Sequence, residues 1–305
     1  MPSIEWAYPF TMTETLFAFL LSINIYLVAI SVMASSNNNN NSNSNSNSNN
    51  NQSTAVQETD NILLVIAHPD DESMFFVPTI RTLVAESKST VHILCLSTGN
   101  FDGLGATRTQ ELFACAAILG IQKQHVHVVD DAALQDGKTN VWAKEDVAKQ
   151  VSTQVDAWSI NKIVTFDNYG VSGHENHVDT SRGVVYFYET SVWGGSGGSG
   201  GSGENSETSN GHCLYLLEST HIFRKYAGIF DVMGSLVQGG SQCFCSLTPW
   251  INYAAMQAHF SQFVWYRRLF VVFSRYTYVN NLIKQQVPKV VLQLGTKKKD
   301  IKKDR

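Results

Sequence analysis

Short apolar runs alternate with segments of helical pattern through the middle of the chain. The apolar runs are typical of short buried strands and cover residues 62–67, 91–97, 125–130 and 162–167. The segments between them have the periodicity and length of crossover helices and cover residues 73–86, 107–119 and 142–158. Such alternation predicts an α/β fold: a Rossmann-like, mostly parallel sheet with helices on both faces.

A longer apolar run precedes this pattern. Residues 15–33 are almost uninterruptedly apolar and approach the ~20 residues that a helix needs to cross a bilayer. We therefore predict a transmembrane anchor at 15–34, after a short N-terminal segment at 1–14. A cleaved signal peptide is the alternative, because Val32-Met33-Ala34 resembles a cleavage site. Glu5 and Glu14, with no Lys or Arg before the run, argue against it.

Two low-complexity segments divide the remainder of the chain. Residues 35–59 are rich in Asn and Ser and predict a disordered tether. The folded domain is expected at 60–296, with a flexible Gly/Ser insertion at 194–210. Residues 297–305 form a basic tail.

Composition narrows the class of protein. With 22 Lys and Arg against 26 Asp and Glu, the formal charge is −4, so we expect no nucleic-acid partner. The five cysteines are an odd number and mostly lie in apolar stretches. They indicate buried thiols in a reducing compartment rather than a disulfide framework.

Acidic residues crowd the end of the first predicted strand. His68, Asp70 and Asp71 follow it within a few residues. Like charges brought close together in a low dielectric repel strongly, and a divalent cation would offset that repulsion. The structural alternative is that these acids open a helix, where the macrodipole favours them, and that His68 is incidental.

A second polar cluster follows the fourth predicted strand. His174 and His177 are three residues apart, so they share one face if the segment is helical. Because ligands gather at the carboxyl ends of parallel strands, the two clusters are expected to meet. One His and one carboxylate from the first cluster with one His from the second would form a three-ligand metal site with an open position, as in a hydrolase.

At these motifs the chain resembles the LmbE-like (PIG-L) de-N-acetylase family, and within it the branch that acts on N-acetylglucosaminyl-phosphatidylinositol. The resemblance covers nearly the whole predicted domain. It rests on Ala67–Glu72 with the residues that follow, on Gly105-x-x-Arg108-x-x-Glu111-Leu112, on Val164–Asp167, on Gly170–His174 with Asn176-His177, and on a late segment from Ala255 to Tyr276.

The resemblance implies a role for each site residue. His68, Asp71 and His177 would bind a divalent metal, with zinc the first choice. Asp70 would be the general base that takes a proton from water. His174 would stabilise the oxyanion or protonate the leaving amine.

The resemblance also gives Arg108 a role, as the residue that contacts the phosphate or sugar of the substrate. The alternative is a surface arginine at the start of a helix.

The resemblance further implies a substrate and a location. We expect hydrolysis of N-acetylglucosaminyl-phosphatidylinositol to the glucosaminyl lipid and acetate, early in GPI-anchor biosynthesis. The expected location is the endoplasmic reticulum membrane, single-pass, with the catalytic domain facing the cytosol. Lys302 and Lys303 resemble a dilysine retrieval signal, and the sequence identifies no protein partner.

Alternatives remain for the activity and for one segment. The activity could be deacetylation of another N-acetylglucosamine conjugate, or the chain could be a non-catalytic glycolipid-binding subunit. The aromatic and Arg-rich residues 254–278 could lie at a lipid interface or pack on the domain.

Overall fold

The computed structural model describes residues 60–86, 89–137, 139–194, 212–238, 242–246 and 248–286. The predicted anchor at 15–34, the tether at 35–59, nearly all of the Gly/Ser insertion and the basic tail lie outside the described residues. The domain boundaries placed there therefore stay predictions. No helix within the described ranges is long and apolar enough to cross a membrane.

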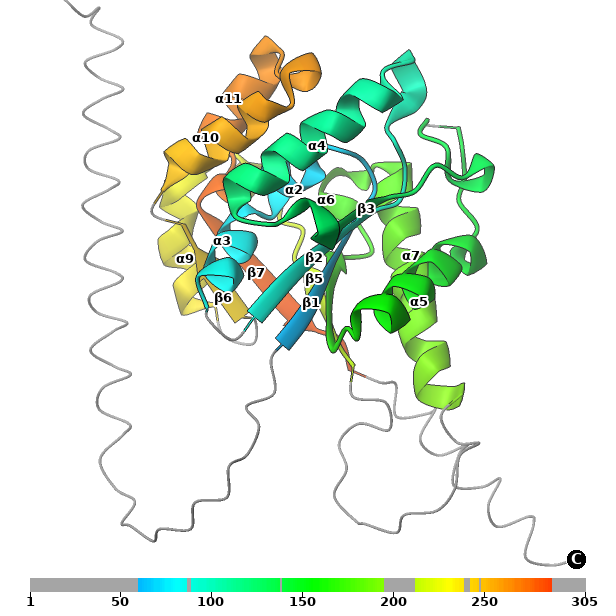
Figure 1. Cartoon of the computed structure of the whole chain (residues 1–305). Helices are drawn as coiled ribbons and strands as arrows, with labels where there is room; N and C mark the ends of the chain where they lie inside the picture. The colour runs from blue at the N-terminus through cyan, green and yellow to red at the C-terminus, as the bar shows by residue number, and fades with distance from the viewer. Residues whose placement is uncertain are drawn as a thin grey trace, which may run out of the picture.

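A seven-stranded mixed sheet forms the centre of the described fold (Figure 1). Its order is β3-β2-β1-β4-β5-β7-β6. The first five strands in this order are parallel, whereas β7 pairs antiparallel with both β5 and β6. The strands are β1 Asp60–Ile66, β2 Ser89–Cys95, β3 Val126–Val128, β4 Lys162–Phe166, β5 Cys213–Leu217, β6 Gln242–Cys245 and β7 Val279–Lys284.

Helices cover both faces of this sheet (Figure 1). The described α-helices are α2 Asp71–Phe75, α3 Val77–Ala85, α4 Gly105–Leu119, α5 Lys144–Trp158, α6 Gly170–Gly173, α7 Glu175–Gly194, α8 Ile222–Lys225, α9 Asp231–Val237, α10 Pro249–Ala258 and α11 Trp265–Phe273. Short 3-10 turns join several of them, including η5 Gly228–Phe230 and η7 Arg275–Thr277.

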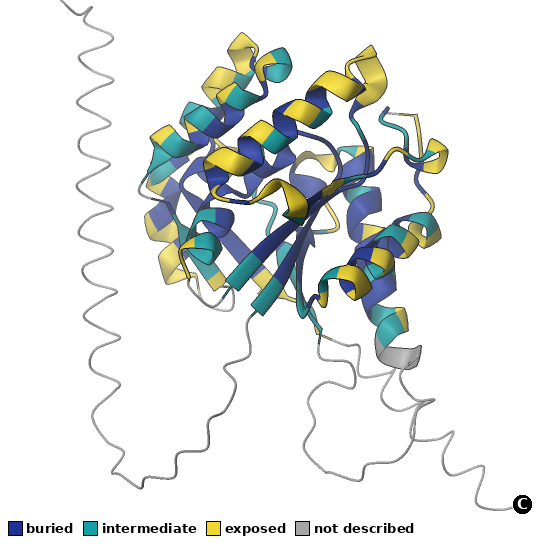
Figure 2. Ribbon diagram, in the orientation of Figure 1, coloured by how far each residue is buried: buried dark blue, intermediate teal, exposed yellow. Residues whose placement is uncertain are grey.

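Alternate residues of β1 enter two separate cores, as the period of a strand requires. Ile62 and Leu64 pack in the cluster that includes residues of α3, α4 and α10. Leu63 and Val65 pack in the cluster that includes residues of α5 and α7. The strands are buried while the outer sides of the helices are exposed (Figure 2), so the sequence of β1 is a continuous apolar run.

The four strands predicted from the sequence are confirmed, with ends shifted by a few residues. Two details differ. The predicted helix at 73–86 is divided into α2 and α3 at Phe76, two residues before Pro78 at the start of α3, because proline favours the first turn of a helix. The sheet is also less uniformly parallel than a Rossmann-like fold implies, because β7 and β6 add an antiparallel edge.

The strand order creates a switch point beside β1. The chain builds outward from β1 through β2 to β3 and then returns to place β4 on the other side of β1. Crossover connections therefore diverge where β1 and β4 end, which is the place where open α/β sheets generally bind ligands. The two polar clusters of the sequence follow these two strands.

Candidate metal centre

The turn after β1 holds Asp70 and Asp71 in different orientations. Asp70 has φ 128°, a backbone conformation that L-residues rarely adopt and that costs about 1–3 kcal/mol. Its N–H donates to Glu72 Oε2 at 3.2 Å. Asp71 instead opens α2, and its Oδ2 accepts the N–H groups of Ala67 at 3.0 Å and His68 at 2.9 Å. The adjacent carboxylates are thus aimed at different partners.

Asp71 is the carboxylate that meets the histidines. Its Oδ1 lies 3.1 Å from His177 Nε2, and its Oδ2 lies 3.8 Å from His68 Nδ1. All three side chains are buried. Burial raises the pKa of Asp71, but the charges of His177 and His68 outweigh it and hold the pKa below its ordinary value. The switch point therefore unites the three residues that the sequence predicts as metal ligands.

The outer contact of His177 fixes its tautomer. His177 Nδ1 lies 3.1 Å from the carbonyl oxygen of Gly170, which can only accept, so Nδ1 carries a proton. The ring also stacks on Phe166, with centroids 4.3 Å apart and an interplanar angle of 5°. In the neutral imidazole, Nε2 then directs a lone pair at the Asp71 carboxylate. Two acceptors then face one another there, and either a proton on Nε2 or a metal cation between them would satisfy both.

Contacts at the outer nitrogen also fix the orientation of His68. Its Nε2 lies 3.2 Å from Asn176 Oδ1 and 3.2 Å from Asp136 Oδ1. The Asn176 amide orientation is set because its Nδ2 donates to the Asn140 carbonyl at 3.1 Å. His68 Nε2 is consequently the donor, and Nδ1 is left free toward Asp71. Outer hydrogen bonds of this kind orient metal-binding histidines.

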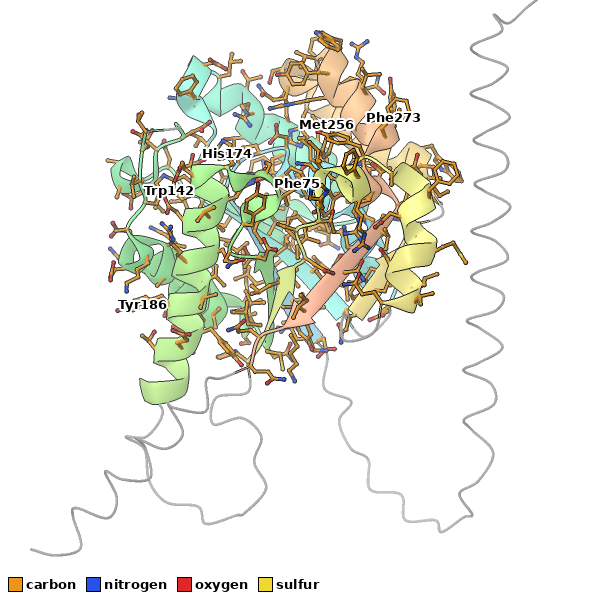
Figure 3. All side chains as sticks on the ribbon, turned by 180° about the vertical axis from the view of Figure 1, so that it is seen from behind. Phe75, Trp142, His174, Tyr186, Met256 and Phe273 are labelled. Carbon is orange, nitrogen blue, oxygen red and sulfur yellow. The ribbon has the colours of Figure 1, made fainter. Side chains whose placement is uncertain are left out.

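His174 completes the cluster of rings. It stacks on His177 at 4.7 Å and meets His68 edge-on at 5.0 Å. Potential ligand atoms of these three histidines lie within 4.8 Å of one another. Burial, with the charges of His177 and His68, lowers the pKa of His174 to about 4. Its Nδ1 is buried and has no hydrogen-bond partner. Figure 3 labels His174 and also Trp142, whose ring centroid lies 6.1 Å from that of His68.

Asp70, the predicted base, is held between two guanidinium groups. Its Oδ1 lies 3.4 Å from Arg108 Nη2, and Arg267 Nη1 donates to its Oδ2 at 2.5 Å. Arg108 is 7% exposed, so it is not the surface residue that the structural alternative required. Arg108 also donates to the carbonyls of Pro69 at 2.7 Å and Gly99 at 2.9 Å. It therefore ties together the loops after β1 and β2.

The sequence did not predict the contact of Arg267 with Asp70 or that of Asp136 with His68. Arg267 stands in the late segment that carried part of the resemblance, but no pattern connected it with Asp70. Asp136 lies in the loop after β3 and pairs with His68. Its place beyond a strand end was the available signal, and only the folded loop shows which histidine it reaches.

A buried pair lies below the turn. Glu72 Oε1 lies 2.5 Å from His259 Nε2, and both residues are 0% exposed. Burial lowers the pKa of His259, but the charge of Glu72 and its hydrogen bond outweigh that effect and raise it. Glu72 thus supports the backbone of Asp70 from inside the fold. His259 contacts Glu72 through Nε2 in the core, and its Nδ1 has no hydrogen-bond partner.

The residues present fit a divalent metal. Two imidazoles, each with its outer nitrogen engaged, and one carboxylate fixed by two backbone N–H groups converge at the carboxyl ends of β1 and β4. Nitrogen and oxygen donors in such a set suit zinc and similar ions. The fold and site define a class: an α/β protein with a candidate metal centre at the carboxyl ends of its parallel strands.

Comparisons with known proteins agree with this class. The family described as "PIG-L: GlcNAc-PI de-N-acetylase" matches residues 63–188. The chain is 37% identical over 245 residues to the "Probable N-acetylglucosaminyl-phosphatidylinositol de-N-acetylase" of Schizosaccharomyces pombe, covering 77% of this chain and 91% of that protein. It is 35% identical over 222 residues to the "N-acetylglucosaminyl-phosphatidylinositol de-N-acetylase" of Bos taurus, covering 72% and 81%. The chain belongs to the family of N-acetylglucosaminyl-phosphatidylinositol de-N-acetylases.

Similarity to solved structures is more distant. The N,N'-diacetylchitobiose deacetylase from Pyrococcus horikoshii is 18% identical with a TM-score of 0.49, and the match covers 75% of this chain and 85% of that chain.

Proposed function

We propose that this protein is an amide hydrolase that removes the N-acetyl group from N-acetylglucosaminyl-phosphatidylinositol, giving the glucosaminyl lipid and acetate. Membership of the family carries the proposal, because the relatives that share this activity in their names align over most of their length. The geometry at the switch point supports it, since the described side chains offer a metal centre and a neighbouring base.

His68, Asp71 and His177 would hold the metal, and we propose zinc. Bound there, such a metal would lower the pKa of water and polarise the amide carbonyl. The outer contacts of His68 and His177 keep both rings in the orientation that binding requires.

Asp70 would act as the general base. Its backbone is constrained by Glu72, and its carboxylate by Arg108 and Arg267. The side chain is therefore positioned before the substrate arrives, which reduces the entropic part of the barrier. The neighbouring guanidinium groups also offset the negative charge that accumulates when the amide is attacked.

His174 would stabilise the developing oxyanion. Its lowered pKa favours a neutral ring at neutral pH, and a neutral imidazole offers one N–H as a donor. Nδ1 has no hydrogen-bond partner, so the ring can direct a nitrogen at the substrate without breaking a contact through that atom. This favours the oxyanion role over protonation of the leaving amine.

Acetate release tests the function directly. The full-length protein is incubated with N-acetylglucosaminyl-phosphatidylinositol in mixed micelles, with chelator, without chelator, and with zinc restored after chelation. We expect equal release of acetate and glucosaminyl lipid, loss of both with chelator, and recovery with zinc. Absence of acetate from the metal-loaded protein would overturn the proposal.

We also propose that the protein resides in the endoplasmic reticulum membrane with its catalytic domain toward the cytosol. The apolar run at 15–33 supports a single-pass anchor. A lipid-linked substrate supports it too, since tethering raises the effective concentration of the domain at the membrane. Protease protection of tagged protein in sealed microsomes tests the orientation: the domain should be digested without detergent.

A further inference from the structure

Large apolar side chains lie exposed at the end of α8 and along α11. We call these residues the apolar face: Tyr226, Trp265, Tyr266, Leu269 and Phe273. Trp265 is 72% exposed and Leu269 is 49% exposed. Single exposed apolar residues are ordinary, but these side chains are contiguous: four of them line one pocket, and the rings of Trp265 and Tyr266 lie 5.8 Å apart. A contiguous apolar surface marks a binding site.

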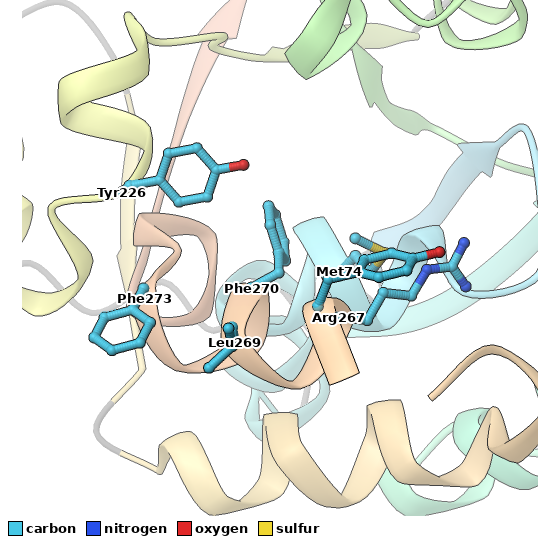
Figure 4. Close-up of a pocket in the computed structure, with 7 residues that line it drawn as sticks. Met74, Tyr226, Arg267, Leu269, Phe270 and Phe273 are labelled. Atoms are coloured by element: carbon cyan, nitrogen blue, oxygen red, sulfur yellow. The ribbon is translucent and has the colours of Figure 1, made fainter. Parts of the chain in front are cut away.

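The pocket in this face has a volume of about 250 Å³ (Figure 4). Its apolar lining includes Met74, Tyr226, Phe270 and Phe273, and Arg267 is the charged residue among those that line it. The pocket lies between the end of α8, α11 and α2, which contributes Met74. Its size and lining suit part of an aliphatic chain rather than a polar ligand.

The pocket adjoins the candidate metal centre. Arg267 lines it and also donates to Asp70 Oδ2 at 2.5 Å. Met74 is in the same short helix as Asp71. A ligand that occupies the pocket would therefore lie beside the arginine that also holds the predicted base.

Cations accompany the apolar face. The sequences of α8 and α11 contain Arg224, Lys225, Arg267 and Arg268 and no acidic residue. Lys225 Nζ lies 5.8 Å from the centre of the Phe270 ring and 5.9 Å from that of Tyr226. Aromatic side chains mixed with Lys and Arg are typical of segments that lie in the interface of a phospholipid bilayer. Arg224 and Arg267 pair with Asp231 and Asp70, so Lys225 and the exposed Arg268 are the charges of this set that complement phosphate headgroups.

We propose that the apolar face lies on a phospholipid bilayer and that the pocket takes an acyl chain from it. That the chain belongs to the substrate rests on the proposed function; contact with the bilayer does not. The arrangement would place the headgroup of a lipid substrate beside Arg267 while its hydrocarbon stays in an apolar environment, so the substrate need not leave the membrane entirely.

A charge in the apolar face should impair action on membrane-borne substrate. Leu269→Asp is compared with Ile118→Asp, a matched control on α4 where Ile118 is 42% exposed. Full-length proteins are assayed on N-acetylglucosaminyl-phosphatidylinositol in phosphatidylcholine vesicles and on the water-soluble N-acetylglucosaminyl-inositol phosphate. The rate on the vesicle-borne lipid divided by the rate on the water-soluble substrate should fall about tenfold or more for Leu269→Asp, because an apolar contact with the bilayer is lost. It should not change for Ile118→Asp.

An unchanged ratio for Leu269→Asp, or an equal fall for both variants, would overturn the proposal. If the wild type hydrolyses neither substrate, the proposed function fails, and contact with the bilayer is still decided by a second measurement.

That measurement uses Trp265 itself. Full-length protein is reconstituted in phosphatidylcholine vesicles with brominated acyl chains, and quenching of tryptophan fluorescence is compared between wild type and Trp265→Phe. We expect Trp265→Phe to remove a measurable share of the quenching. No difference would overturn the proposal, since a protein covering this face, whether a partner or residues 15–34 of the chain, would keep Trp265 from the lipid.

Discussion

Replacing Asp231 by asparagine should destabilise the fold without touching the metal centre. Asp231 Oδ2 accepts from Arg275 Nε at 2.5 Å, and Arg275 is 0% exposed. Arg275 also donates to Ser235 Oγ at 2.7 Å and Asn281 Oδ1 at 2.5 Å. A second arginine, Arg224, donates to Asp231 Oδ1 at 2.7 Å. This network joins α9 to η7 and β7, next to the apolar face.

The cost follows from the charge that would remain buried. Breaking a buried pair by neutralising one partner costs about 3–5 kcal/mol. Arg275 would keep its two neutral acceptors, and the new amide oxygen could still accept one hydrogen bond, so we expect the lower end, about 3 kcal/mol. Arg224 is partly exposed and adds at most about 1 kcal/mol. The expected loss in the free energy of unfolding, about 3–4 kcal/mol, is a large share of the ~5–15 kcal/mol that stabilises a typical domain.

The loss should depend on pH. Burial raises the pKa of Asp231, but the hydrogen bond from Arg224 and the charge of Arg275 outweigh it and hold the pKa below its ordinary value. A carboxylate with a depressed folded pKa stabilises the protein above its unfolded pKa of about 3.9, and that contribution disappears as pH falls through the folded value. The difference between wild type and variant should thus be complete at pH 7 and shrink below about pH 4.

Urea denaturation of the full-length protein in detergent, followed by tryptophan fluorescence, measures this difference. At a slope of about 3 kcal/mol/M, the midpoint should fall by about 1 M. Asp156→Asn on the exposed side of α5 is the control and should change stability by less than about 0.5 kcal/mol. A loss below about 1 kcal/mol for the Asp231 variant, or one that stays constant down to pH 3, would refute the reasoning.

Other predictions concern the site. Asp70→Asn should retain bound metal but lose at least about 100-fold in turnover, whereas His177→Ala should lose both; metal analysis beside acetate release checks this, and normal turnover by either variant would contradict it. Gly170→Ala should strain the backbone by about 1–2 kcal/mol, because φ at this position is +61°. The new Cβ would also lie 2.6 Å from the Cβ of His177, so metal analysis should show a lower metal content. Gly99→Ala should reduce acetate release, since the new Cβ would lie 2.5 Å from the Arg108 guanidinium and displace it. Unchanged kinetics would count against a role for Arg108 at the site.

Much of the fold could be predicted because its parallel strands are buried on both faces. Such strands appear in the sequence as apolar runs, and helices of suitable length separate them. The antiparallel edge gave no comparable signal, since β6 has only the four residues Gln242–Cys245 and is largely not buried. Its pairing with β7 is long-range in sequence and depends on the rest of the sheet.

The ligand cluster could be predicted for a related reason. His68 and Asp71 follow β1, His177 follows β4, and parallel neighbours end at the same edge of a sheet. Local sequence thus determined which residues stand at that edge and what chemistry they offer.

Tertiary structure alone decided which partner each side chain meets. Asp70 and Arg267 are 197 positions apart, and Glu72 and His259 are 187 apart. No periodicity links such residues, because their contact is set by the way α10 and α11 pack over the turn after β1. Local sequence was enough for the parallel strands β1 to β4, the helices between them and the polar residues at the ends of β1 and β4. Packing decided that Asp71 faces the histidines while Asp70 faces two arginines, since only the folded chain fixes the directions in which neighbouring side chains point.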